Sequence, residues 1–95
     1  MRDKIKEISE RAVPILRRAG VKKAAIFGSF ARGDERKDSD IDLLIDFPDG
    51  KSLLDFIGLQ QELEKGLGRT VDLGEFGTLK PRLQPYVTRE QVKIL

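Results

Sequence analysis

The 95-residue chain contains no cysteine and no histidine. Without cysteine it can form neither a disulfide nor a thiolate metal site. Without histidine it lacks both the commonest general base and the commonest ligand of transition metals. Any metal bound by this chain would therefore have to sit among oxygen ligands, which favours Mg²⁺, Mn²⁺ or Ca²⁺.

Long apolar runs and a strong charge imbalance are also missing. No stretch approaches the roughly 20 apolar residues that span a membrane, and the N-terminal sequence Met1-Arg2-Asp3-Lys4 does not begin a signal peptide. We therefore expect a cytoplasmic protein without a membrane partner. The net charge of +2 is too small to indicate nucleic acid as a direct partner. Asparagine is absent and 36% of the residues are charged, which favours a thermophilic source.

Two amphipathic helices are predicted from apolar residues that recur every three or four positions. The first spans Asp3–Ala19 and contains Pro14, which predicts a kink or a division into two shorter helices. The second begins after Ser52, a good N-cap, and ends around Gly66 or Gly68.

Four short apolar segments predict strands, the last of them at a sheet edge: Lys23–Phe27, Asp40–Phe47, Arg69–Leu73 and Val92–Leu95. A short helix is expected from Pro81 to about Thr88. Three phenylalanines fall at apolar positions and are predicted to be core: Phe27, Phe47 and Phe56. The order of elements predicts one α/β (α+β) domain over residues 1–95, a small mixed sheet of about four strands with helices packed on it.

Asp40 and Asp42 are the first candidates for chemistry. Residues two apart on a strand point to the same face, so these carboxylates would lie together while Ile41 points into the core. Adjacent carboxylates repel each other unless a cation neutralises them, and Mg²⁺ is usually bound by one or two carboxylates together with substrate phosphates. The pair by itself is equally compatible with a solvated strand edge.

The segment from Gly28 to Gly33 joins the first strand to a short helix. Gly28 would let a phosphate approach the backbone, and Ser29 offers a hydroxyl and an N–H near a helix N-terminus. Arg32 lies one helical turn further, on the side of Ser29, where it could reach a phosphate or brace the carboxylates. Taken alone, a Gly-Ser pair more often marks a plain strand-to-helix turn.

Asp72 is the third acidic candidate, because Val71 and Leu73 flank it on a short strand and its side chain must point to the other face. If that strand lies beside the strand of Asp42, a third carboxylate completes a two-metal site and could activate an attacking hydroxyl. The alternative is a surface acid on an edge strand. Asp46 shares the face of Asp40 but lies roughly 20 Å further along the strand, so we interpret it as a strand-end residue.

These blocks together resemble the nucleotidyltransferase superfamily that includes DNA polymerase beta, and most closely its minimal members. The resemblance rests on three segments: Gly28-Ser29, Arg32-Gly33 and Ser39-Asp40-Ile41-Asp42-Leu43-Leu44-Ile45. In that family the Gly-Ser turn binds phosphate, the two acids bind metal, and a third acid, matched by Asp72, stands on a later strand. The resemblance therefore implies a polymerase-beta-like fold and a two-metal Mg²⁺ site formed by Asp40, Asp42 and Asp72, with Mn²⁺ as the other candidate metal.

The activity implied by the resemblance is transfer of a nucleoside monophosphate, AMP from ATP, to a hydroxyl group. Minimal family members pair with HEPN-domain toxins as antitoxins, and some add AMP to a tyrosine of the toxin, so this is the leading hypothesis. A second hypothesis is a non-catalytic antitoxin that occludes a toxin. A third is a small-molecule nucleotidyltransferase that acts as a homo-oligomer.

Overall fold

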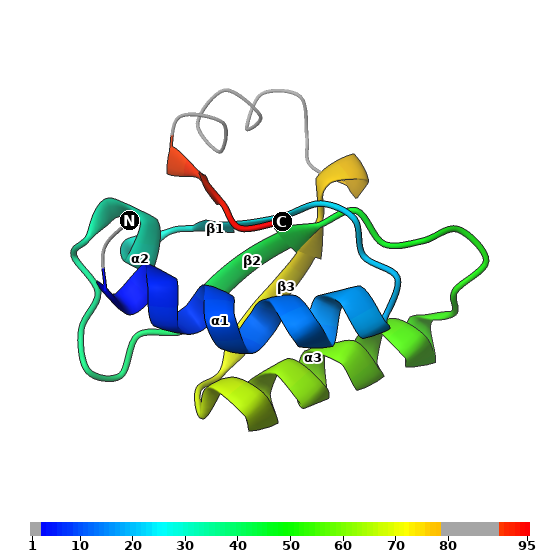
Figure 1. Cartoon of the computed structure of the whole chain (residues 1–95), viewed down its shortest axis with the longest axis horizontal. Helices are drawn as coiled ribbons and strands as arrows, with labels where there is room; N and C mark the ends of the chain where they lie inside the picture. Colours follow the sequence, from blue (N-terminus) through cyan, green and yellow to red (C-terminus); the bar gives the residue numbers. More distant parts are fainter. Residues whose placement is uncertain (1–2, 79–89) are drawn as a thin grey trace.

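The computed structural model describes residues 3–78 and 90–95. Within them, two long helices cover one face of a four-stranded sheet (Figure 1). The strands lie in the order β3 (Val71–Glu75), β2 (Ile41–Ile45), β1 (Ala24–Phe27) and β4 (Val92–Lys93). Strand β1 is antiparallel to β2 and β4, whereas β2 and β3 are parallel. The small mixed sheet predicted from the sequence, with its last strand at an edge, is confirmed.

Helix α1 (Asp3–Arg18) runs without interruption through Pro14, so the prediction of two shorter helices is wrong. Proline removes one backbone donor, but Pro14 is on the exposed side of the helix. Ile15 and Leu16, the next two residues, are buried against the core and hold this part of the helix in place. Tertiary packing therefore outweighs the local cost of the proline.

Helix α3 (Leu53–Leu67) has well-formed ends. Ser52 and Asp55 make a reciprocal capping box at its start, and Gly68 ends it with a left-handed φ of 68°. The predicted N-cap and the later of the two predicted ends are thus confirmed. Leu59 and Leu63 are buried in the core that α3 forms with the sheet.

Alternate strand residues face the two helices and form the core with them: Ala24, Ile26, Ile41, Leu43, Ile45, Val71 and Leu73. Because side chains alternate along a strand, Asp42 and Asp72 point to the opposite face of the sheet. Strand β2 begins one residue after Asp40, and β3 begins two residues later than predicted.

No helix in the described ranges is long and apolar enough to cross a membrane.

The aromatic core differs from the prediction. Phe30, in the short helix α2 (Ser29–Arg32), is only 1% exposed and is among the largest fully buried side chains. Phe47 and Phe56 are half-buried and pack edge to face, with ring centroids 5.6 Å apart, at the margin of the core. Phe27 is half-buried and stands outside the main cluster. The helix predicted from Pro81 to Thr88 lies outside the described residues.

Candidate active site

The parallel pairing of β2 and β3 places Asp42 directly opposite Asp72. On its other side Asp42 is paired with Phe27, the last residue of β1. Asp42 is half-buried, whereas Asp72 is exposed on the outer strand β3. Two carboxylates from separate parts of the chain therefore meet on the face of the sheet that the helices leave open, as predicted for the case in which these strands are neighbours.

The surroundings of Asp42 disfavour its charged form and raise its pKa above the ordinary value. Partial burial is the largest cause, followed by the negative charges of Asp72 and then Asp40. A hydrogen bond with Asp72 acts in the same direction, while the positive charge of Arg32 acts against it. A carboxylate in this position is stabilised by a proton or by a cation.

Gly28 joins β1 to α2 in a conformation (φ 72°, ψ −148°) that is essentially restricted to glycine. A Cβ atom at this position would overlap Oδ2 of Asp42 and would lie 3.1 Å from its Cγ. The missing side chain therefore leaves the space that the Asp42 carboxylate occupies. Ser29, half-buried, is the first residue of α2, and no side chain caps that helix end.

Arg32 ends α2 and is exposed, with its guanidinium bound to two acids. Its Nε donates to Asp34 Oδ2 and its Nη1 to Glu90 Oε2, each at 3.2 Å. Its charge still reaches Asp42, whose pKa it lowers. Its hydrogen bonds thus go to Asp34 and Glu90 and not to the predicted acids, and contact with a phosphate or with the carboxylates stays a prediction.

Asp40 lies immediately before β2 and is exposed. It is close enough to raise the pKa of Asp42. In residues 3–78 and 90–95, no three acidic side chains are gathered tightly enough to form a complete metal site on their own. The structure therefore brings Asp42 and Asp72 together and leaves Asp40 beside them. Asp46 lies beyond the end of β2 and is exposed.

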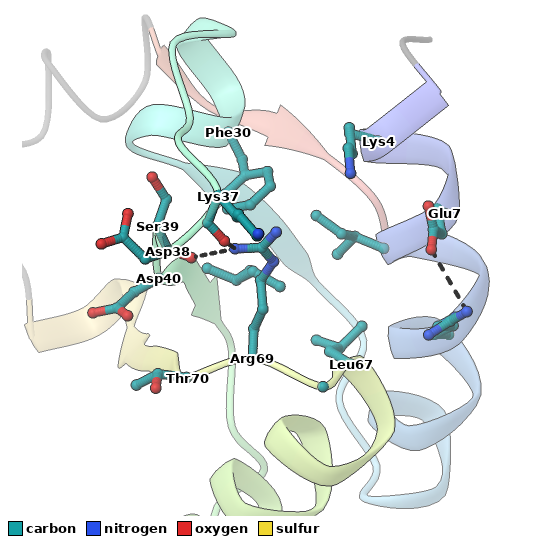
Figure 2. Close-up of a pocket in the computed structure, with 14 residues that line it drawn as sticks. Lys4, Glu7, Phe30, Lys37, Asp38, Ser39, Asp40, Leu67, Arg69 and Thr70 are labelled. Carbon is teal, nitrogen blue, oxygen red and sulfur yellow. Dashed lines mark hydrogen bonds and ion pairs between the residues drawn. The ribbon is translucent and has the colours of Figure 1, made fainter.

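A cavity of about 620 Å³ lies next to this site, between the first half of α1, the segment before β2 and the turn from α3 to β3 (Figure 2). Ile8, Phe30 and Leu67 contribute apolar walls. Of the six predicted site residues only Asp40 lines it, and its carboxylate points away from the neighbouring Arg69 (Figure 2). The cavity is thus adjacent to the cluster of acids and is not its centre.

Helix α3 fixes the start of β3 through two side chains that the sequence interpretation missed. Glu64 Oε2 accepts a hydrogen bond from the N–H of Val71 at 3.0 Å, and Gln60 Nε2 donates to the carbonyl of the same residue at 3.1 Å. Both hydrogen bonds are made to the backbone of Val71, the residue before Asp72, and so support the position of Asp72. Because Gln60 and Glu64 are four residues apart, the sequence predicts that they share one face of the helix. It does not predict which strand they bind.

Comparison with known proteins shows the family of this chain. The nucleotidyltransferase domain model matches residues 3–94. A Methanocaldococcus jannaschii protein named a candidate protein adenylyltransferase is 45% identical over 91 residues, which cover 96% of this chain and 98% of that protein. The described sheet and helices also match the fold of solved relatives.

The solved structure of a candidate minimal nucleotidyltransferase superposes with a TM-score of 0.81 at 39% identity, over 95% of this chain and 92% of that one. One chain of the complex between a tri-AMPylated Shewanella oneidensis HEPN toxin and an MNT antitoxin gives a TM-score of 0.73 at 20% identity, over 95% of this chain and 71% of that one. The 20% match shows a shared fold. The extent of the family match and the identity to its relatives show that this chain belongs to the nucleotidyltransferase domain family, as a minimal nucleotidyltransferase.

Proposed function

We propose that this protein transfers AMP from ATP, with Mg²⁺, to a tyrosine hydroxyl of a HEPN-domain toxin and thereby acts as its antitoxin. The observation that carries the proposal is the pairing of Asp42 with Asp72 beside the Gly28 turn, where the pKa of Asp42 is raised. The name of the Methanocaldococcus relative, a candidate protein adenylyltransferase, supports the choice of AMP. The fold shared with a complex of a tri-AMPylated HEPN toxin and an MNT antitoxin supports the choice of partner.

The side chains at this site fit Mg²⁺, with Mn²⁺ as the second candidate. The donors are carboxylate oxygens, and the pKa of Asp42 is raised by its partial burial and by the negative charges of Asp72 and Asp40. Mg²⁺ is commonly held by one or two carboxylates together with substrate phosphates rather than by a cage of protein ligands. Asp42 and Asp72 would hold it, and Asp40, beside them, would join when ATP is bound. Bound Mg²⁺ would neutralise charge on the triphosphate and the acids.

The transfer requires one bond to form and one to break. The tyrosine oxygen attacks the α-phosphorus of ATP, and the bond from that phosphorus to the bridging oxygen of the β-phosphate breaks, so that pyrophosphate leaves. The carboxylate of Asp72 is exposed and is the group we assign to accept the proton of the hydroxyl. Gly28 and Ser29 would bind the triphosphate through backbone N–H groups and the Ser29 hydroxyl. The charge of Arg32, which already reaches Asp42, would favour the bound phosphates.

The test uses α-labelled ATP, Mg²⁺ and the purified toxin partner. The wild-type protein should label the toxin, and Asp42→Asn should abolish the label by removing one carboxylate of the pair. Asp46→Asn is the matched control, because Asp46 is an exposed acid just beyond the same strand and outside the cluster. The Asp46→Asn protein should label the toxin as strongly as the wild type does.

Two other results would overturn the proposal. Toxin inhibition without label, unchanged by Asp42→Asn, would identify a protein that acts by occlusion. Label on a small molecule and not on the toxin, by a homo-oligomer, would identify a small-molecule nucleotidyltransferase. Dependence on the metal is tested separately, by the loss of label with a chelator and its recovery with added Mg²⁺ or Mn²⁺.

A further inference from the structure

Arg69 contacts two of the three chain segments that carry the proposed site and lies at the start of the third. It lies in the turn between α3 and β3, and its half-buried side chain reaches back across the sheet end (Figure 2). Its Nη1 donates to the carbonyl of Lys37 at 2.8 Å and to the carbonyl of Ser39 at 3.0 Å. Its guanidinium also lies over the ring of Phe30, with Cζ 5.2 Å from the ring centroid.

These contacts fix the backbone on one side of Asp40, and the next residue of the same turn fixes the other side. The carbonyl of Ser39 accepts from Arg69, and the N–H of Ile41 donates to the carbonyl of Thr70 at 3.0 Å. Because Asp40 is exposed, its side chain has little packing of its own to orient it. The direction of its carboxylate therefore depends on the backbone that Arg69 and Thr70 hold.

The contact with Phe30 extends the same connection to the Gly-Ser turn. Phe30 follows Ser29 directly and is only 1% exposed, so it fixes α2 in the core and offers its ring to Arg69. Asp72 lies three residues after Arg69, on the strand that Arg69 precedes. The guanidinium of Arg69 thus connects the segments that carry Ser29, Asp40 and Asp72, which are far apart in the sequence.

In residues 3–78 and 90–95 the Arg69 guanidinium makes no ion pair with an acid, and its hydrogen bonds go to the backbone carbonyls of Lys37 and Ser39. An arginine that served to balance the charge of the acids would be expected to bind a carboxylate. We propose that Arg69 is a positioning residue that holds Asp40 at a fixed place relative to Asp72 and the Gly28-Ser29 turn. The catalytic part of this inference rests on the proposed function, whereas the structural part does not.

Two substitutions separate positioning from charge. Arg69→Lys keeps the positive charge but loses the planar group that can bind two carbonyls and stack on a ring. Arg69→Met keeps the length of the side chain and loses the charge as well. Arg18→Met is the matched control, because Arg18 is exposed and its hydrogen bond, to Glu62 at 3.3 Å, joins α1 and α3 and involves none of the proposed site residues.

The first readout is amide hydrogen exchange over residues 36–41, measured without ATP. Both Arg69 variants should exchange roughly tenfold faster there, because the segment loses the bonds that restrain it, and the control should match the wild type. The second readout is the kinetics of AMP transfer. Both variants should lower kcat by on the order of 100-fold, the effect of a misplaced catalytic group, with little change in KM for ATP.

The results that would overturn this inference differ from those that would overturn the proposed function. Unchanged exchange and unchanged kcat in both Arg69 variants would exclude a positioning role. A raised KM in Arg69→Met that Arg69→Lys restores would identify a phosphate-binding cation instead. A wild-type protein without AMP transfer would remove the proposed function, but faster exchange in both variants would still show that Arg69 positions the Asp40 segment.

Discussion

Replacing Gly28 by alanine tests whether this glycine exists to make room for Asp42. The conformation of Gly28 (φ 72°, ψ −148°) costs a residue with a Cβ about 1–3 kcal/mol. At roughly 4–8 °C per kcal/mol for a chain of this size, Tm should fall by about 4–24 °C. The added Cβ would also overlap Oδ2 of Asp42 and force the carboxylate to move by on the order of 1 Å, which can lower kcat about 100-fold.

Gly50→Ala is the control for the loss of stability that comes from the backbone conformation alone. Gly50 also has a positive φ of 82°, but a Cβ there would have nothing within 4 Å. Both variants should lose thermal stability, and only Gly28→Ala should lose AMP transfer when rates are measured well below both values of Tm. Normal kcat in a folded Gly28→Ala protein would refute the reasoning, because it would mean that the position of Asp42 does not limit the reaction.

A double-mutant cycle measures the same contact without any activity assay. If part of the cost of Gly28→Ala comes from the overlap with Asp42, that cost should be smaller in an Asp42→Ala background, where the carboxylate is gone. Coupling of 0.5 kcal/mol or more, about the lower limit for residues in contact, is expected from urea unfolding. Strict additivity would assign the whole cost to the backbone of Gly28.

Three further outcomes follow from the described contacts. Because the pKa of Asp42 is raised in the folded protein, charged Asp42 opposes folding. In metal-free buffer Asp42→Asn should therefore raise Tm at about pH 7 and not at about pH 3, with the gain in Tm appearing as the pH rises through the raised pKa. Equal changes in Tm at both pH values would contradict this. Gly58→Ala should stabilise α3 by about 0.5–1 kcal/mol, since a Cβ there meets nothing within 4 Å, and denaturant unfolding would reveal a loss if this helix face were crowded. Ser52→Ala should cost about 1 kcal/mol by the same measurement, because it removes the capping box with Asp55; an unchanged midpoint would mean that packing alone holds the start of the helix.

Local patterns in the sequence were sufficient to predict most of the fold. The apolar spacing of α1 and α3 and the cap at Ser52 depend on residues within a turn or two of each other, which is what periodicity reports. Of the two alternatives predicted at Pro14, the division into two shorter helices is wrong, because the compensating burial of Ile15 and Leu16 depends on the rest of the fold. Strand ends shifted by one or two residues, since they are fixed by the partner strand.

The candidate site was predicted as a set of residues but not as an arrangement. The same-face rule relates Asp42 to its neighbours on one strand, whereas its pairing with Asp72 depends on the parallel register of β2 and β3. Arg69 was interpreted only as the first residue of a strand. Its bonds to Lys37 and Ser39 span 32 and 30 residues of sequence, and no local pattern reports contacts at that distance.

The electrostatics of the acids bear on the choice between catalysis and occlusion. Folding partly buries Asp42 and brings it close to Asp72 and Asp40, which together raise its pKa, so the metal-free protein keeps a charge that opposes its own stability. Arg32 offsets only part of this, because its guanidinium is also bound to Asp34 and Glu90. A protein that acts by occlusion gains nothing from such a cluster, and Asp42→Asn would improve its stability without cost. A cation that binds the folded protein repays this cost by mass action, so Mg²⁺ should raise the Tm of the wild type and leave that of Asp42→Asn almost unchanged.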